Sequence, residues 1–221
     1  MRKQLLFIVT LCLLGCSEKK TLQKVSSIEN PNFILIFMDD LGYGDIMPFG
    51  SINYETPHIN KLAQEGMLFT NFYSVQAVCS ASRAALLTGC YSNRIGISGA
   101  LMPYSTVGLH KNEITIAELL KEKGYATAIF GKWHLGFQEK FLPLNHGFDT
   151  FLGLPYSNDM WPVDFDGNQI SDTTNWKKKS YPQLPLIKDF KKIDEIRTLE
   201  DQAKLTTLYT EKSVEFINNN K

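Results

Sequence analysis

Short apolar runs that end in charged or reactive side chains are the sequence feature that most strongly constrains the fold of this chain. Residues 33–38 are apolar without alternation, which is typical of a strand buried on both faces of a parallel sheet, and the run stops at Asp39 and Asp40. A second run at residues 126–130 is followed by Lys132 and His134. Because ligands of open α/β sheets bind beyond the carboxyl ends of strands, we expect these polar side chains to share one site.

Helical patterns alternate with the apolar runs. Thr56 with Pro57 predicts a helix start, Ser80 or Ser82 can cap a helix that places Cys79 at its N-terminus, and Thr115 begins another helix. A further strand is expected at residues 68–73. This alternation predicts an α/β fold with a mostly parallel sheet flanked by helices.

The last third of the chain gives two different signals. Residues 161–197 lack a clear period and indicate a long surface excursion. From Thr198 a capped helix is expected, with Leu205, Leu208 and Phe216 on one side.

The first sixteen residues indicate export rather than folding. Met1 to Lys3 form a basic start, and residues 5–14 are apolar but too short to span a bilayer comfortably. The run ends at Cys16 in a bacterial lipobox-like sequence, so we expect lipidation of Cys16 in an exported lipoprotein of the periplasm or outer membrane. A signal peptide cleaved elsewhere, or a short anchor helix, is the alternative. Residues 17–30 are polar and predict a tether to a folded domain at residues 31–221.

Charge composition argues against one class of partner. Lys plus Arg equals Asp plus Glu, at 23 each, so there is no basic excess for binding nucleic acid.

Asp39, Asp40 and Cys79 each allow more than one interpretation. Two neighbouring carboxylates repel unless a cation lies between them, and oxygen ligands favour calcium or magnesium over zinc, but a solvated acidic turn is also compatible. Cys79 can be a small buried residue, a disulfide partner of Cys90, or a reactive thiol at a helix N-terminus.

Several segments resemble the sulfatase family. CSASRAALLTG at residues 79–89 is similar to the sulfatase signature, PNFILIFMDDLGYGD at 31–45 to the opening strand with its metal-binding aspartates, and GKWHLG at 131–136 to a second active-site segment. TPHINKLAQEGMLFTNFY at 56–73 and HGFDTFLGLPYS at 146–157 are also similar, the latter to the arylsulfatase A-like branch. The resemblance implies an alkaline-phosphatase-like fold, incomplete in this chain, and a sulfuric ester hydrolase.

The resemblance also implies roles for individual residues. Cys79 is expected to be oxidised by a separate maturation enzyme to formylglycine, whose hydrated aldehyde attacks sulfur and later expels sulfate. Asp39, Asp40 and modified Cys79 are expected to bind one Ca²⁺, and Arg83 to hold the diol. Lys132 and Ser157 are expected to contact the sulfate, and His134 to accept a proton from the diol.

The resemblance leaves the substrate and some ligands open. Further calcium ligands and a leaving-group acid are expected from sequence beyond residue 221, so we expect a fragment that is inactive and poorly stable alone. Expected partners are a sulfated small molecule or polysaccharide and a membrane reached through the lipid. The alternatives are a phosphate or phosphonate ester hydrolase of the same superfamily, and an inactive lipoprotein that binds sulfated sugars.

Overall fold

The computed structural model describes residues 30–221, so the expected signal peptide, Cys16 and nearly all of the tether lie outside the described residues. The chain divides into an N-terminal unit that ends at Phe37 and a compact unit, Met38–Lys221. In the first unit, residues 30–37 form neither helix nor strand. Among the helices of residues 30–221, none combines the length and apolar character needed to cross a membrane.

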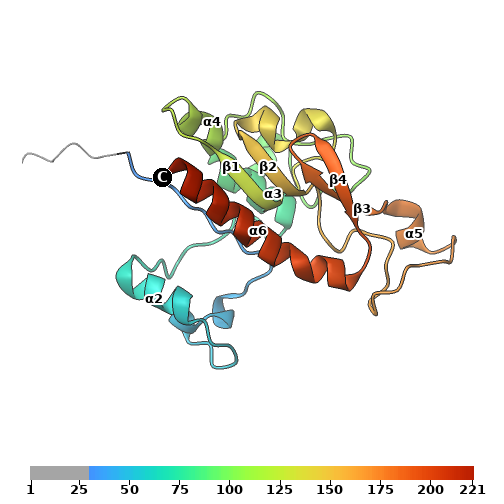
Figure 1. Cartoon of the computed structure of the whole chain (residues 1–221), viewed down its shortest axis with the longest axis horizontal. Helices are drawn as coiled ribbons and strands as arrows, with labels where there is room; N and C mark the ends of the chain where they lie inside the picture. The colour runs from blue at the N-terminus through green and yellow to red at the C-terminus, as the bar shows by residue number, and fades with distance from the viewer. Residues whose placement is uncertain (1–29) are drawn as a thin grey trace, which may run out of the picture. The chain divides into compact units, whose positions relative to one another are not determined.

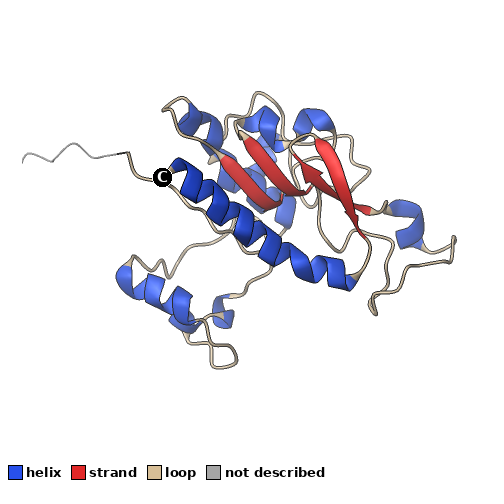
Figure 2. Cartoon of the chain, viewed as in Figure 1, coloured by secondary structure: helices blue, strands red, loops and turns tan. Residues whose placement is uncertain are grey.

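The second unit contains the helices and strands of the described chain (Figures 1 and 2). In chain order, the α-helices and strands are α2 Pro57–Glu65, α3 Cys79–Thr88, α4 Ile116–Lys121, β1 Ala128–Lys132, β2 Thr150–Leu154, α5 Trp176–Ser180, β3 Leu184–Lys188, β4 Lys191–Ile196 and α6 Leu199–Asn220. Short 3₁₀ helices lie at Tyr43–Asp45, Met47–Phe49, Ser92–Ile95, Glu139–Phe141 and Pro143–His146.

The four strands form one mixed sheet in the order β1-β2-β3-β4. β1 and β2 are parallel, with Lys132 opposite Leu154, whereas β2–β3 and β3–β4 are antiparallel. The expected α/β class is therefore confirmed, but the described sheet is mixed rather than mostly parallel. The parallel pair matters most for the site, because β1 and β2 end at the same edge of the sheet.

Alternating side chains on the strands pack against helices on the two faces of the sheet. Leu152 and Leu186 lie in one buried cluster with Leu205 of α6, and Tyr209 packs against it. Phe151 belongs to a second cluster with side chains from α3 and α4. Because neighbouring strand residues point to opposite faces, the sheet is the middle of three layers, with α6 on one side and α3 and α4 on the other (Figure 1).

Capping explains where two helices begin. Thr115 accepts a hydrogen bond from the Glu118 backbone N–H at 3.2 Å, and the Glu118 carboxylate accepts from the Thr115 N–H at 2.7 Å. Thr198 and Asp201 make the same reciprocal pair at the start of α6. These capping boxes satisfy amide groups that have no partner within the helix, and both starts agree with the sequence prediction.

Two expected strands are absent from the described structure. Residues 33–38 and 68–73 are not strands, and large side chains such as Phe72 and Tyr73 are 75% and 79% exposed. A strand needs a neighbour to accept and donate its backbone hydrogen bonds, and no strand within residues 30–221 pairs with either segment.

The prediction of a long surface excursion at residues 161–197 is also wrong. It contains α5 and the β3–β4 hairpin, and it contributes Trp161, Val163 and Ile196 to the buried core. The cap predicted at Ser80 or Ser82 differs too: Val78 is the N-cap of α3, and Cys79 is its first residue.

Candidate active site

Arg83 connects helix α3 to Asp39 and to the end of strand β1. Its Nη2 donates to Asp39 Oδ1 at 3.0 Å, and its Nη1 donates to the Lys132 backbone carbonyl. The Arg83 side chain is 12% exposed, against 30% for Asp39. Arg83 also lies one helical turn after Cys79, so the two residues share a face of α3.

Lys132 extends this network to the end of the neighbouring strand. It is the last residue of β1, and its Nζ donates both to Asp39 Oδ2 and, at 3.0 Å, to Ser157 Oγ. Ser157 is buried and follows the end of β2 by three residues. Asp39, Arg83, Lys132 and Ser157 thus form one connected polar cluster, although they are distant in sequence.

The two cations determine the ionisation of Asp39. Burial raises the pKa of this carboxyl group, but the hydrogen bonds and positive charges of Lys132 and Arg83 outweigh burial, so its pKa lies below the ordinary value. Asp39 is therefore a carboxylate at neutral pH. One carboxylate faces two cations, which leaves the cluster positive and suited to an oxyanion.

His134 is a buried residue with an unusual backbone conformation. Its side chain is fully buried, its backbone adopts the left-handed conformation at φ 59, and its N–H donates to the Pro155 carbonyl at 3.2 Å. Left-handed conformations of residues other than glycine are uncommon and persist where surrounding contacts impose them.

The His134 ring has one partner that sets its protonation. Nε2 lies 2.7 Å from the Leu101 carbonyl oxygen, and because a carbonyl only accepts, Nε2 must carry the hydrogen. Nδ1 is buried and has no hydrogen-bond partner among residues 30–221. Burial lowers the pKa of His134 to about 4; the Leu101 carbonyl and Asp39 oppose this shift, while the charges of Lys132 and Arg83 reinforce it. His134 is thus a neutral base at pH 7.

Cys79 forms no disulfide in the described structure. It is half-buried at the start of α3, and Cys90 is exposed and also free, so the alternative of a Cys79–Cys90 disulfide is not realised. The Ser82 hydroxyl donates to the Cys79 carbonyl at 3.0 Å and fixes the first turn. A helix N-terminus stabilises negative charge, which suits Cys79 for chemistry that forms an anion.

Asp39 and Asp40, two of the expected metal ligands, are adjacent in a turn of the described structure. Asp40 is next to Asp39 and adopts the left-handed conformation at φ 56, so the backbone turns at Asp40 itself rather than at Gly42 or Gly44. Within residues 30–221, no three His, Cys, Asp or Glu side chains lie close enough together to hold a metal. The two aspartates supply hard oxygen donors of the kind calcium takes, but calcium needs six to eight such oxygens.

The structure brings together most of the residues predicted from sequence. Asp39, Arg83, Lys132 and Ser157 are directly connected, and the charges of Asp39, Arg83 and Lys132 act on His134. His58 and His110 are exposed, and His146 is buried against Trp133, with ring centroids 5.8 Å apart, which agrees with structural or surface roles. Sequence reasoning did not identify the contact between Leu101 and His134, because a contact to a backbone group leaves no side-chain pattern.

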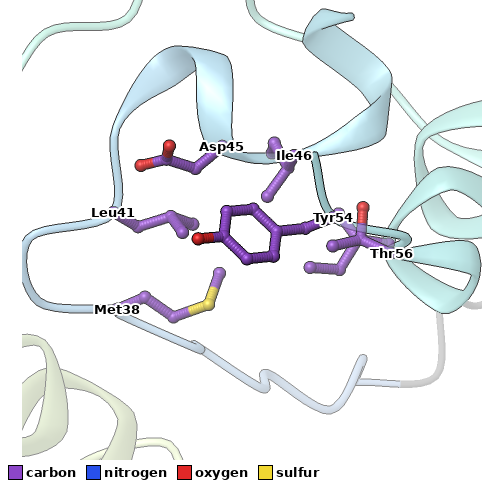
Figure 3. A pocket seen from close by; sticks show the side chains of 7 residues that line it. Met38, Leu41, Asp45, Ile46, Tyr54 and Thr56 are labelled. Atoms are coloured by element: carbon purple, nitrogen blue, oxygen red, sulfur yellow. The ribbon is translucent and has the colours of Figure 1, made fainter. Parts of the chain in front are cut away.

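A separate hollow is unsuited to the same chemistry. It has a volume of about 420 Å³, and its lining includes Met38, Leu41 and Ile46, around the Tyr54 ring (Figure 3). Its one carboxylate, Asp45, accepts a hydrogen bond from the Gly42 N–H at 2.7 Å. No member of the polar cluster lines this hollow, so we assign the candidate active site to the cluster.

Known sulfatases are similar to this chain both in sequence and in structure. Bovine (Bos taurus) arylsulfatase A is 50% identical over 135 residues, which is 60% of this chain and 27% of the bovine protein. Human N-acetylgalactosamine-6-sulfatase is 36% identical over 201 residues, 85% of this chain and 36% of the human protein. The crystal structure of PsFucS1 sulfatase from Pseudoalteromonas sp. superposes with a TM-score of 0.70 at 33% identity, over 82% of this chain and 39% of that one.

These relatives are all longer than the chain described here, which spans 27% and 36% of the two curated relatives. The mixed sheet with its flanking helices matches the sulfatase structure, and with it the alkaline-phosphatase-like fold. The sulfatase family model matches residues 31–221, and the chain therefore belongs to the sulfatase family.

Proposed function

We propose that the protein hydrolyses organic sulfate esters at the cluster around Cys79. The observation that carries this proposal is that Asp39 joins Arg83 to Lys132, and Lys132 in turn contacts Ser157. Arg83 shares a face of α3 with Cys79. Two fixed cations and a hydroxyl donor match the charge and hydrogen-bonding capacity of a sulfate group.

Cys79 is the proposed nucleophile after oxidation of its thiol-bearing carbon to an aldehyde by a separate maturation enzyme. Addition of water to the aldehyde gives a geminal diol. One diol hydroxyl loses its proton as its oxygen attacks sulfur, the bond from sulfur to the alcohol oxygen breaks, and that oxygen takes up a proton and leaves as the alcohol. The second hydroxyl then loses its proton, the carbon–oxygen bond to the sulfate breaks, and the aldehyde is restored. A free, half-buried thiol at a helix start supports this assignment.

His134 is the proposed acceptor of the proton from the second hydroxyl. Its Nε2 is committed to the Leu101 carbonyl, and its Nδ1 has a lone pair and no partner among residues 30–221. Because its pKa is about 4, the imidazole is neutral at pH 7 and able to accept a proton. Arg83 and Lys132 orient the sulfate through fixed positive charge, and Ser157 positions the Lys132 ammonium.

Asp39 and Asp40 are proposed to contribute oxygen ligands to a divalent cation, calcium by its preference for carboxylates, with modified Cys79 as a further ligand. A cation bound there would draw negative charge from the sulfate oxygens. The two aspartates fit this role as hard donors but provide only part of a shell, so the remaining ligands must come from water, substrate or other residues.

The proposed substrate is a sulfate ester of an aryl alcohol or a carbohydrate. Two relatives are named for such activities, as an arylsulfatase and as an N-acetylgalactosamine-6-sulfatase. The lipobox-like sequence at Cys16 supports the further proposal of a lipid-anchored protein exported to the periplasm or outer membrane. Loss of fatty-acid labelling in Cys16→Ser would test the anchor without involving catalysis.

Turnover of matched esters tests the function. The full-length protein, produced with its maturation enzyme, should release sulfate from an aryl sulfate faster than phosphate from the corresponding aryl phosphate. Cys79→Ala should abolish release, whereas Cys90→Ala, which removes the other free thiol, should not. Faster phosphate release would favour the phosphate esterase alternative, and no release of either group by protein with modified Cys79 would contradict hydrolysis.

A further inference from the structure

Ser80 makes a buried contact that the proposed chemistry does not use. It is the second residue of α3 and is fully buried. Its Oγ accepts a hydrogen bond from the Leu101 backbone N–H at 3.0 Å. Leu101 lies between Ser92–Ile95 and α4, in a segment without regular structure, so this contact ties an otherwise irregular backbone to the start of the helix that carries Cys79.

The other backbone group of Leu101 contacts His134. The Leu101 carbonyl accepts from His134 Nε2 at 2.7 Å. The N–H and the carbonyl of Leu101 belong to the two peptide planes that meet at its Cα, so the Ser80 contact anchors the residue whose carbonyl contacts His134. A second tether lies two residues earlier, where the Gly99 N–H donates to Gln76 Oε1 at 3.3 Å. Ser80 and Gln76 thus both hold the segment that contacts His134.

The direction of these hydrogen bonds has a chemical consequence. The Leu101 carbonyl can only accept, so it selects the tautomer of neutral His134 with hydrogen on Nε2 and a lone pair on Nδ1. If the carbonyl turned away, the ring would lose this preference, and a proton on Nδ1 would block acceptance of another proton there. Burial of Nδ1 without a partner in the described structure is unfavourable by itself, so the Leu101 contact is needed to maintain this arrangement.

We infer that Ser80 is a positioning residue that acts through the backbone of Leu101 to keep His134 in its Nε2–H tautomer. This inference rests on the proposed function for its catalytic meaning, since only a proton-accepting Nδ1 makes the tautomer important. The tautomer itself is a property of the folded protein and can be measured without turnover.

Nitrogen NMR of the imidazole rings tests the tautomer directly. In protein labelled with ¹⁵N-histidine at pH 7, the His134 signals, assigned by their loss in His134→Asn, should show a protonated Nε2 and an unprotonated Nδ1. Ser80→Ala should give a mixture of tautomers or faster exchange of the Nε2 hydrogen with water. Ser92→Ala is the matched control, because Ser92 is equally buried and its hydroxyl has no partner among residues 30–221. It should leave the His134 signals unchanged.

A wild-type His134 protonated on Nδ1 would overturn the inference. A Ser80→Ala spectrum identical to that of the wild type would also overturn it. Ser80→Thr, which keeps the hydroxyl, should retain the wild-type tautomer, so loss of the tautomer in both Ser80 variants would indicate a packing effect and contradict the hydroxyl's role.

Kinetics then connect the tautomer to catalysis. Ser80 adjoins Cys79, so activity must be divided by the fraction of modified Cys79, measured from the mass of the peptide that contains it. On this basis Ser80→Ala should lower kcat by roughly tenfold with little change in KM, as expected for loss of one hydrogen bond that acts in the transition state. An unchanged kcat despite an altered tautomer would overturn the catalytic part of the inference. If wild-type protein turned over no sulfate ester, the proposed function would fail while the NMR result still decided the role of Ser80.

Discussion

Lys132 and Ser157 lie just where two parallel strands end, and the Lys132 ammonium donates a hydrogen bond to the Ser157 hydroxyl at 3.0 Å. This contact joins the ends of β1 and β2 above the core. The same ammonium also contacts Asp39. Ser157 and Asp39 therefore both hold the ammonium of Lys132, the proposed sulfate-binding cation.

Removing the Ser157 hydroxyl should leave the Lys132 ammonium less firmly positioned. In Ser157→Ala, we expect roughly a tenfold increase in KM for an aryl sulfate and a smaller effect on kcat, since a hydrogen bond from a charged donor contributes about 1.5 kcal/mol. Steady-state kinetics measure both constants. Ser180→Ala in α5 provides the control, and equal KM values for wild type and Ser157→Ala would argue against the positioning role.

Arg83 should not be replaceable by lysine. A lysine cannot donate simultaneously to Asp39 and to the Lys132 carbonyl in the planar geometry of a guanidinium. We expect Arg83→Lys to lower kcat by about 100-fold, the loss typical for one preorganised donor. The exposed Arg94 offers the same substitution away from the cluster, and Arg94→Lys should retain activity. Comparable activity in both variants would show that Arg83 has no special role.

Asp40→Asn tests the proposed cation site while preserving the backbone. Asn adopts the left-handed conformation of Asp40 readily, so the substitution mainly removes a negative charge. We expect the free calcium concentration for half-maximal activity to rise by about tenfold or more. Asp166→Asn, at an exposed position, is the control. Activity that persists in a strong calcium chelator would contradict calcium dependence itself.

Close contact between β1 and β2 predicts a stability effect at Gly153. A Cβ added to Gly153 would lie 1.7 Å from the Gly131 carbonyl oxygen on the paired strand. We expect Gly153→Ala to reduce the free energy of unfolding by about 3 kcal/mol, at the upper end for overpacking. Urea denaturation measures the change. Gly44→Ala meets nothing within 4 Å and should leave the midpoint nearly unchanged; similar midpoints for both variants would show that the strands can separate freely.

Burial of neutral His134 predicts how stability depends on pH. Its pKa is about 4 in the folded protein and near the ordinary 6.5 when unfolded. Between these values the unfolded chain binds more protons, so this contribution is complete above pH 6.5 and is lost as pH falls toward 4. It amounts to about 3 kcal/mol. His134→Gln should therefore flatten the stability curve over this window, whereas parallel curves would mean that His134 titrates normally.

The sequence predicted the elements whose signals are local. Thr115 and Thr198 begin helices because each forms a capping box within one turn, and Cys79 lies at a helix start as expected. The strand near residues 126–130 is observed as β1, shifted to Ala128–Lys132. The proximity of Asp39 to Lys132 was also expected, although Asp39 lies in a turn and does not follow a strand.

The errors concern properties that depend on distant segments. Residues 33–38 and 68–73 have strand-like composition, but a strand forms only beside a partner, and residues 30–221 provide none for them. In β3, Pro185 obscures the strand pattern, and in β4 charged residues such as Lys192 and Glu195 obscure the buried Ile196. The Ser80–Leu101–His134 connection could not be predicted, because two of its hydrogen bonds use backbone groups.

The chemical state of residue 79 decides whether the cluster carries out the proposed reaction. Mass spectrometry of the peptide that contains residue 79, from full-length protein produced with a maturation enzyme, measures this state directly. We predict an aldehyde that has lost the thiol sulfur and that reacts with a hydrazide. An unmodified thiol at residue 79 in protein that actively releases sulfate would contradict the proposed nucleophile.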